Sequence, residues 1–249
     1  MILNLKNKNI LITGAATGMG RASALDAAKH GANLVLADIN EEGLNEVSSK
    51  LDPLNCNYKI MHMDVTSIDS TEKNITSAEA WFDGGINALV HFAGALEGSV
   101  VDIDEISPET WHRIININLH GTYNVTRSVA KFMKSRNSGV ILLTSSGAGV
   151  NGPGSSAPYS SSKGGTHGLT MNLQNYLSPY GIRVHDILPG NIRSPLKEGQ
   201  LKEALVNKGD KELFKQSDKE LGDPEGVAKI VSFIISDDAD YLRGSILTR

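Results

Sequence analysis

The sequence predicts a single doubly wound α/β domain, residues 1–249, with a mostly parallel seven-stranded sheet. Three observations predict this fold class. Short apolar runs alternate along the chain with amphipathic segments of helical period. The apolar runs are hydrophobic at consecutive positions, which is typical of strands buried on both faces of a parallel sheet. A chain of 249 residues, 40% of them hydrophobic, is also long enough for one large core.

The predicted elements follow one another in strand–helix order. Seven strands are expected at residues 9–13, 33–38, 58–64, 87–94, 139–145, 182–190 and 244–248. Six helices are expected at residues 18–30, 41–51, 68–80, 108–136, 158–178 and 224–236. Ser107-Pro108 is a helix start signal, and His30-Gly31 is a helix stop signal. No internal repeat or low-complexity linker divides the chain.

Composition and charge exclude several classes of function. The net charge is −4, and the basic residues are spread along the chain, so we expect no nucleic-acid partner. The longest apolar run, residues 86–96, is too short and too polar for a membrane span, and we expect no membrane partner. The lone Cys56 suits a reducing compartment, and the N-terminus lacks signal-peptide features. We therefore expect a cytoplasmic protein, and we assign no metal ligands.

The first predicted strand-to-helix turn carries a glycine motif, TGAATGMG, in which Gly14, Gly18 and Gly20 are spaced G-x-x-x-G-x-G. Glycine permits unusual backbone angles and lets a pyrophosphate approach main-chain N–H groups. The helix N-terminus adds partial positive charge. A plain tight turn is the alternative, whereas a P-loop is excluded because no Gly-Lys-Ser/Thr follows. The position between a strand and a helix favours a dinucleotide-binding loop.

An acidic residue, Asp38, stands at the end of the second predicted strand, roughly 20 residues beyond the glycines. A carboxylate here accepts hydrogen bonds from ribose hydroxyls and repels a 2′-phosphate. Thr17 stands where an NADP-binding chain often has a basic residue, and Ile39 follows the acid. We therefore favour NAD over NADP as cofactor. The alternative role for Asp38 is the N-cap of the helix that begins at Glu41.

Five ordered motifs together resemble those of the short-chain dehydrogenases/reductases, over nearly the whole chain. They are TGAATGMG (13–20), DVT (64–66), NLHG (118–121), YSSSK (159–163) and PGNIRS (189–194). The resemblance implies a Rossmann fold and a nicotinamide cofactor. The cofactor-binding residues it implies, with Asp38, are Gly14, Thr17, Gly18, Met19, Gly20, Asp64, Val65, Ala93, Gly94, Tyr159, Lys163, Pro189, Gly190, Ile192 and Ser194.

Tyr159 and Lys163 are placed i and i+4 on one face of a predicted helix. A phenol has an ordinary pKa near 10 and is a poor acid or base at neutral pH. An ammonium about 4 Å away, at an effective dielectric constant of about 20, favours the phenolate by roughly 4 kcal/mol. That equals about three pK units and would bring Tyr159 near pH 7, where general acid/base catalysis is most effective.

The resemblance also selects Ser146 as the catalytic serine that hydrogen-bonds the substrate oxygen, and Ser145 is the alternative. Ser155 or Ser156 is expected to cap the following helix. Asn118 is implied to place its main-chain carbonyl in a proton relay that runs from Lys163 to solvent. The catalytic residues implied are thus Asn118, Ser146, Tyr159 and Lys163.

These residues predict an oxidoreductase that transfers a hydride between NAD(H) and a secondary alcohol or ketone. The alternatives are a 3-oxoacyl thioester reductase of the same family and a non-catalytic regulator that senses NAD(H). Family members usually form tetramers, so we expect a homotetramer or homodimer. A substrate lid is expected at residues 193–223, and a mostly apolar pocket is expected to include Ala95, Leu96, Val150 and Ile192.

Two positions depart from the family pattern. The family usually has Asn-Asn-Ala-Gly after the fourth strand, whereas this chain has HFAG, residues 91–94. We expect His91 to be a partly buried strand-end residue rather than a catalytic one. Asn87 stands where an Asp is common.

Overall fold

The predicted strands form one parallel sheet in the computed structural model, which describes residues 3–99, 101–152, 155–208 and 219–248. The strand order is β3-β2-β1-β4-β5-β6-β7, and every neighbouring pair is parallel. The strands are β1 (Asn9–Thr13), β2 (Asn33–Asp38), β3 (Tyr58–His62), β4 (Ala88–His91), β5 (Gly139–Thr144), β6 (Ile182–Leu188) and β7 (Gly244–Leu247). The doubly wound α/β prediction is confirmed.

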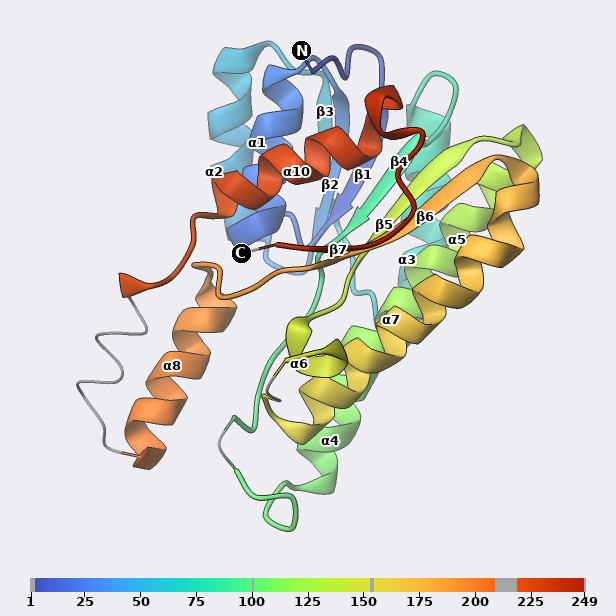
Figure 1. Cartoon of the computed structure of the whole chain (residues 1–249). Helices are drawn as coiled ribbons and strands as arrows, with labels where there is room; N and C mark the ends of the chain where they lie inside the picture. Colours follow the sequence, from blue (N-terminus) through green and yellow to red (C-terminus); the bar gives the residue numbers. More distant parts are fainter. Residues whose placement is uncertain (1–2, 100, 153–154, 209–218, 249) are drawn as a thin grey trace.

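Helices cover both faces of this sheet (Figure 1). One face carries α1 (Gly18–Lys29), α2 (Glu41–Leu51) and α10 (Pro224–Ile235), and the other carries α3 (Ile68–Trp81), α5 (Gly121–Arg136) and α7 (Ala157–Leu177). Side chains alternate between the two layers: Ile10 and Ile12 of β1 join one core cluster, and Leu11 joins the other. This alternation explains why the strands are apolar at consecutive positions.

The strand order changes direction between β1 and β4: β2 and β3 lie on one side of β1, and β4 to β7 lie on the other. This change of direction marks the expected place of a ligand site. β1 pairs with β2 on one side and with β4 on the other, so the connections that follow β1 and β4 lead to opposite faces. In open α/β sheets a ligand binds at such a switch point, beyond the carboxyl ends of the strands. The glycine loop and the segment after His91 both lie at this edge.

The helical prediction needs three corrections. The segment predicted as one helix over 108–136 is α4 (Pro108–Ile115), a π-helical turn (Asn116–His120) and then α5. Two helices were not predicted: α6 (Gly147–Val150) and α8 (Pro195–Lys208), which forms the first part of the expected lid. Lid residues 209–218 lie outside the described residues. Short 3-10 turns stand at Asp52–Leu54, Ser178–Tyr180 and Asp237–Ala239.

No helix in the described ranges is both long enough and apolar enough to cross a membrane.

Candidate active site

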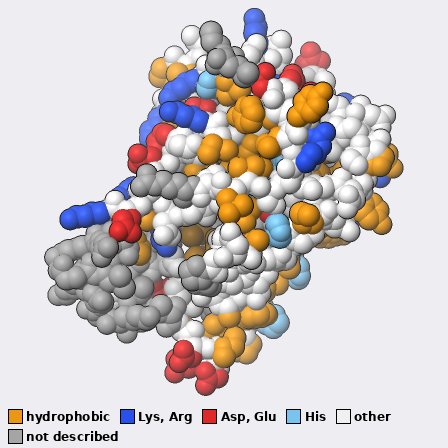
Figure 2. Space-filling view, viewed as in Figure 1, with side chains coloured by type: hydrophobic (Ala, Val, Ile, Leu, Met, Phe, Trp, Pro, Cys, Tyr) orange, Lys and Arg blue, Asp and Glu red, His pale blue; other side chains and the backbone are white. Residues whose placement is uncertain are grey.

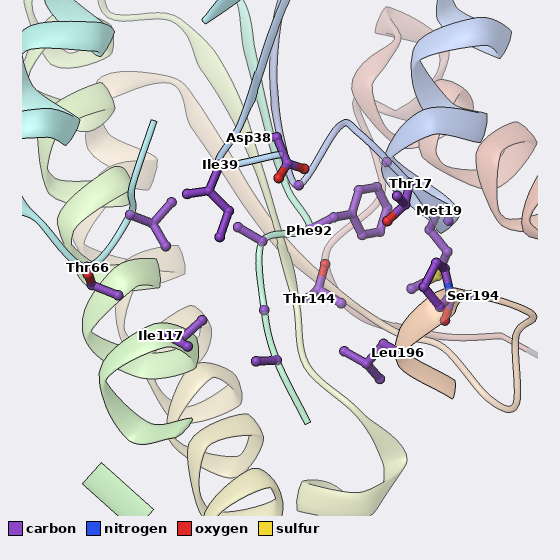
Figure 3. Close-up of a pocket in the computed structure, with 18 of the residues that line it drawn as sticks. Thr17, Met19, Asp38, Ile39, Thr66, Phe92, Ile117, Thr144, Ser194 and Leu196 are labelled. Carbon is purple, nitrogen blue, oxygen red and sulfur yellow. The ribbon is translucent and has the colours of Figure 1, made fainter. Parts of the chain in front are cut away.

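Two adjoining cavities lie beyond the carboxyl ends of the strands. The larger has a volume of about 510 Å³ and the smaller about 440 Å³. The residues that line both are Met19, Thr144, Tyr159, Ser194 and Leu196. Figure 3 shows Asp38 and Ile39 at one end of the larger cavity, Thr66 and Ile117 along one side, and Met19, Ser194 and Leu196 along the other.

The glycine loop forms a close backbone cradle in the larger cavity. Gly14 has φ +68°, and a Cβ on it would lie 2.6 Å from the Ala93 nitrogen. A Cβ on Gly20 would overlap the Gly14 carbonyl oxygen. Thr17 is the N-cap of α1, its side chain makes no capping hydrogen bond, and the first turn contains no acidic residue. The start of α1 therefore offers main-chain donors to an anion.

Asp38 is held at the end of β2 by two main-chain groups. Its Oδ2 accepts from the Ala16 nitrogen, and its Oδ1 accepts from the Asn40 nitrogen, each at 3.0 Å. The alternative role as a helix cap is wrong, because the Asn40 side chain caps α2 by accepting from Gly43. Asp38 lines the larger cavity, as do Asp64 and Val65. Asp64 Oδ1 accepts from the nitrogen and the hydroxyl of Thr66, which fixes that turn.

Tyr159 and Lys163 lie together on α7, as predicted, and both line the larger cavity. Lys163 Nζ donates to the Thr144 carbonyl at 2.7 Å and lies 5.7 Å from the centroid of the Tyr159 ring. Burial lowers the pKa of Lys163 to about 8. Burial raises the pKa of Tyr159, and a hydrogen bond with Ser146 partly opposes that rise.

This direction differs from the sequence-based prediction, in which Lys163 lowers the pKa of Tyr159 toward 7. That prediction placed an ammonium beside the phenol and left out the cost of burial. In the structure desolvation is the largest influence on the pKa of Tyr159. Without a bound ligand, Tyr159 therefore holds its proton.

The structure separates the two adjacent serines. Ser146 lines the smaller cavity, and its Oγ accepts from the Ala148 nitrogen at 3.2 Å, which caps α6. Ser145 is 1% exposed, and its hydroxyl donates to the buried carboxylate of Asp186. His167 Nδ1 lies 2.9 Å from the same carboxylate oxygen. Both serines line the smaller cavity, but the Ser145 hydroxyl is already engaged by Asp186, whereas the Ser146 hydroxyl keeps its proton available for a substrate.

Ser156 is the residue that caps α7: its Oγ accepts from the Tyr159 nitrogen at 3.3 Å. Of the two serines expected to cap this helix, Ser155 instead lines the smaller cavity. The cap fixes the first turn of α7, which carries Tyr159.

Asn118 lies in the π-helical turn and is fully buried. Its side chain bonds the main chain of Ala95 on both sides, with Oδ1 accepting at 2.8 Å and Nδ2 donating at 2.9 Å. Nδ2 also donates to Ser162 on α7 at 3.0 Å. Asn118 lines neither cavity. Its hydrogen bonds join the segment after β4 to α7, the helix that carries Tyr159 and Lys163. Its place in a proton relay stays a prediction.

His91 is fully buried rather than partly buried. Its Nδ1 lies 2.7 Å from the Thr13 hydroxyl, and the Thr144 hydroxyl donates to its carbonyl at 2.7 Å. Burial, assisted by the charge of Lys163, lowers the pKa of His91 to about 3, so its ring stays neutral. These bonds tie β4 to β1 and β5. At the other end of β4, Asn87 Oδ1 accepts from the Asn9 nitrogen at 2.8 Å.

The remaining predicted residues divide between the two cavities. Gly18, Ala93, Gly94 and Ala95 line the larger one, and Leu96, Pro189, Gly190 and Ile192 line the smaller one. The expectation for Val150 is wrong: it is 39% exposed and lines neither cavity. The α6 turn carries it to the surface. Within the described chain, no three His, Cys, Asp or Glu side chains gather as a metal site requires.

Sequence reasoning missed several lining residues, among them Phe92, Ile117 and Thr144. Thr144 is the most informative, because its carbonyl holds Lys163 and its hydroxyl holds β4. Its position as the last residue of β5, directly before the serines, was the available signal.

A family model described as short chain dehydrogenase matches residues 8–204. The chain belongs to the short-chain dehydrogenase family. It is an oxidoreductase that transfers a hydride between a nicotinamide cofactor and an alcohol or ketone. The glycine cradle, the uncapped start of α1 and Asp38 fit the pyrophosphate and ribose of such a cofactor.

Two curated short-chain dehydrogenases match almost end to end. A 3-oxoacyl-[acyl-carrier-protein] reductase of Thermotoga maritima is 30% identical, over 98% of this chain and 97% of the relative. A levodione reductase of Leifsonia aquatica is 31% identical, over 96% of this chain and 91% of the relative.

Solved structures with either nicotinamide cofactor share the fold. An NAD⁺-bound xylitol dehydrogenase superposes with TM-score 0.88 at 28% identity, covering 98% of each chain. A variant of actinorhodin polyketide ketoreductase with NADPH superposes with TM-score 0.90 at 26% identity, covering 97% of this chain and 95% of that one. The likeness therefore supports a nicotinamide site and leaves the choice between NAD and NADP to local residues.

Proposed function

We propose that this short-chain dehydrogenase interconverts a secondary alcohol and a ketone with NAD(H), using Tyr159 as the acid and base. One observation carries the proposal: Tyr159 lies where the two cavities meet, between Ser146 on one side and Lys163 on the other. A substrate in the smaller cavity would then have its oxygen beside two hydroxyls. The larger cavity would hold the cofactor.

The chain's own residues supply binding and proton transfer. The bound cofactor supplies or accepts the hydride at the substrate carbon. In the direction of ketone reduction, Ser146 donates a hydrogen bond that holds the carbonyl oxygen. Tyr159 gives its proton to that oxygen as the hydride reaches the carbon, so the carbonyl becomes an alcohol and the tyrosine a phenolate. Lys163 stabilises the phenolate until solvent returns the proton, and we assign Asn118 to that return path.

Asp38 supports the choice of NAD over NADP. Its carboxylate lines the larger cavity and would repel a 2′-phosphate. Two basic side chains are among the described residues that line the same cavity: Arg113, which is paired with Glu97, and Lys163, whose charge we assign to Tyr159. Neither is therefore available to offset the repulsion.

We further propose a homotetramer or homodimer. The exposed apolar residues Tyr123 on α5 and Met171 on α7 support one contact face. Figure 2 shows hydrophobic side chains gathered over α10 and β7, where Phe233 and Leu247 are exposed. Light scattering on the purified protein gives the assembly state directly.

The decisive experiment follows NADH or NADPH absorbance while the protein is mixed with a panel of ketones, sugars, steroids and a 3-oxoacyl thioester. Wild-type protein is expected to oxidise NADH with at least one ketone and to prefer NADH over NADPH. Tyr159→Phe should reduce kcat/KM by about 100- to 10,000-fold while NADH still binds, because it removes only the transferred proton.

Tyr176→Phe provides the matched control, since Tyr176 lies on the same helix and is 71% exposed. It is expected to behave like the wild type. A Tyr159→Phe variant with wild-type turnover would contradict the assigned role. Tight NADH binding without turnover of any ketone would instead favour the sensing regulator.

A further inference from the structure

The wall of the smaller cavity carries a half-buried lysine that the proposed chemistry does not use. Lys197 lies in the first turn of α8 and lines this cavity. Its main-chain nitrogen donates to Ser194 Oγ at 3.2 Å, and Ser194 borders both cavities. The first turn of α8 is therefore fixed against the site.

Lys197 belongs to a short chain of hydrogen bonds. Its Nζ donates to Gln200 Oε1 at 2.8 Å, and Gln200 Nε2 donates to Ser155 Oγ at 2.8 Å. These three side chains join α8 to the loop before α7, and all three line the cavity. The Ser155 oxygen accepts from Gln200, so its own proton is available to donate.

Among the described residues, the ammonium of Lys197 has no negative partner. No carboxylate of the described residues lies within 4.0 Å of it, and no Asp or Glu is among the residues that line the smaller cavity. Burial lowers the pKa of Lys197, which is the sign of a charge that has lost water without gaining a counter-charge. A bound anion would offset that cost.

The same cavity holds Ser146 and Tyr159, which act on the reacting oxygen under the proposed function. Its volume of about 440 Å³ suits a small molecule. A substrate that fills it would contact the two hydroxyls with its carbonyl or alcohol group and Lys197 with another part. The protein therefore offers two polar contact points joined by an apolar wall that includes Leu96, Ile192 and Leu196.

We propose that Lys197, Gln200 and Ser155 form a subsite for a carboxylate, so that the substrate is an oxo or hydroxy acid. This inference rests on the proposed function. One ammonium and one hydroxyl donor match the charge and the two oxygens of a carboxylate. A phosphate dianion would leave charge uncompensated, and no arginine is among the described residues that line the cavity.

The test uses two ketones of nearly equal shape, 4-oxocyclohexanecarboxylate and 4-oxocyclohexanecarboxamide. Wild-type enzyme with NADH is expected to prefer the carboxylate in kcat/KM by on the order of 10- to 100-fold, the usual effect of a charge-assisted hydrogen bond. Lys197→Met should reduce this preference to about onefold, because it should lower kcat/KM for the carboxylate ketone and leave that for the carboxamide unchanged. Gln200→Glu should do the same, because the new glutamate would pair with the Lys197 ammonium.

Lys202→Met is the matched control, because Lys202 is on the same helix, is exposed and does not line the cavity. It should keep the wild-type preference. Equal loss in both lysine variants would mean general charge attraction and would overturn the subsite. Weaker NADH binding by Lys197→Met with an unchanged preference would assign the lysine to the cofactor and would also overturn it.

A binding measurement separates the subsite from the proposed function. Calorimetry measures the binding of cyclohexanecarboxylate and of cyclohexanecarboxamide to the enzyme–NADH complex. Neither compound has a ketone group, so binding is measured without turnover. Preference for the carboxylate that disappears in Lys197→Met supports the subsite even if neither ketone reacts. Turnover of both ketones without any preference retains the proposed function and rejects the subsite.

Discussion

The two cavities are built in different ways. The larger is walled by the ends of β1, β2, β4 and β5 and by the loop at the start of α1, where the main chain is held by sheet pairing and buried side chains. The smaller is walled largely by α6, α8 and the segments beside them. In the part of the chain that the structure describes, α8 is held by Ser194 and Arg193 at its first turn and by the bond from Gln200 to Ser155.

Changes in the two cavities should therefore have different effects. Residues of the larger cavity also hold the sheet together, so a change there should damage cofactor binding and stability at once. The described residues of α8 lie outside both core clusters, so a change there should alter substrate choice and leave stability nearly intact.

The largest effect is expected from Gly14→Ala, which would break the larger cavity. The new Cβ meets the Ala93 main chain at 2.6 Å and forces a side chain onto φ +68°. We expect a loss of about 3 kcal/mol in the free energy of unfolding and loss of measurable NADH binding. Urea denaturation and fluorescence titration measure the two effects.

Gly84→Ala is the control for that variant. Gly84 has φ +80° and nothing within 4 Å of its would-be Cβ, so it reports the backbone cost alone, about 1 kcal/mol. Equal losses in the two variants would show that the close approach to Ala93 contributes nothing.

A second effect, of intermediate size, concerns pH. The buried Lys163 has a pKa of about 8 in the free protein, so it is charged below that pH and neutral above it. Because the charge of Lys163 stabilises the phenolate, kcat/KM for NADH at saturating ketone should be level below pH 8. Above pH 8 this parameter, which reports the free enzyme, should fall about tenfold per pH unit.

Lys163→Arg keeps its charge and should remove that fall, although its rate is expected to be lower. His91 should add no change near pH 6, because its pKa is about 3. A fall near pH 6 that His91→Asn removes would contradict the neutral assignment.

The smallest effect on stability is expected from Leu196→Ala. Leu196 is half-buried beside both cavities, so its removal should cost less than about 1 kcal/mol and raise KM for a cyclic ketone about tenfold. Leu36→Ala on β2, where the side chain is fully buried, should cost about 3 kcal/mol. Similar losses in the two variants would reject the division described above.

The sequence predicted the larger cavity better than the smaller one. Strand ends are set by hydrophobic runs, and glycine spacing reports a backbone requirement, so Gly14 and Asp38 were identified from local patterns. The π-helical turn at Asn118 and the short helix α6 depend on contacts distant in the sequence. Sequence periodicity therefore did not predict them.

Tertiary burial explains the other differences. The charge of Lys163 was foreseen, but the cost of enclosing Tyr159 was not, since burial belongs to the assembled fold. His91 likewise differs from expectation, because its hydrogen bond with Thr13 forms only when β1 and β4 pair. The engagement of Ser145 by Asp186 required β6 to lie beside β5.

The uncapped start of α1 has a consequence for how much of this protein persists in a cell. Main-chain donors that the protein's own side chains do not satisfy are satisfied by the ligand, so ligand binding and folding are thermodynamically linked. At a cofactor concentration 100 times its dissociation constant, linkage adds about 2.7 kcal/mol to the folded state. A fall in the nicotinamide pool would then increase the unfolded fraction and its removal by proteases.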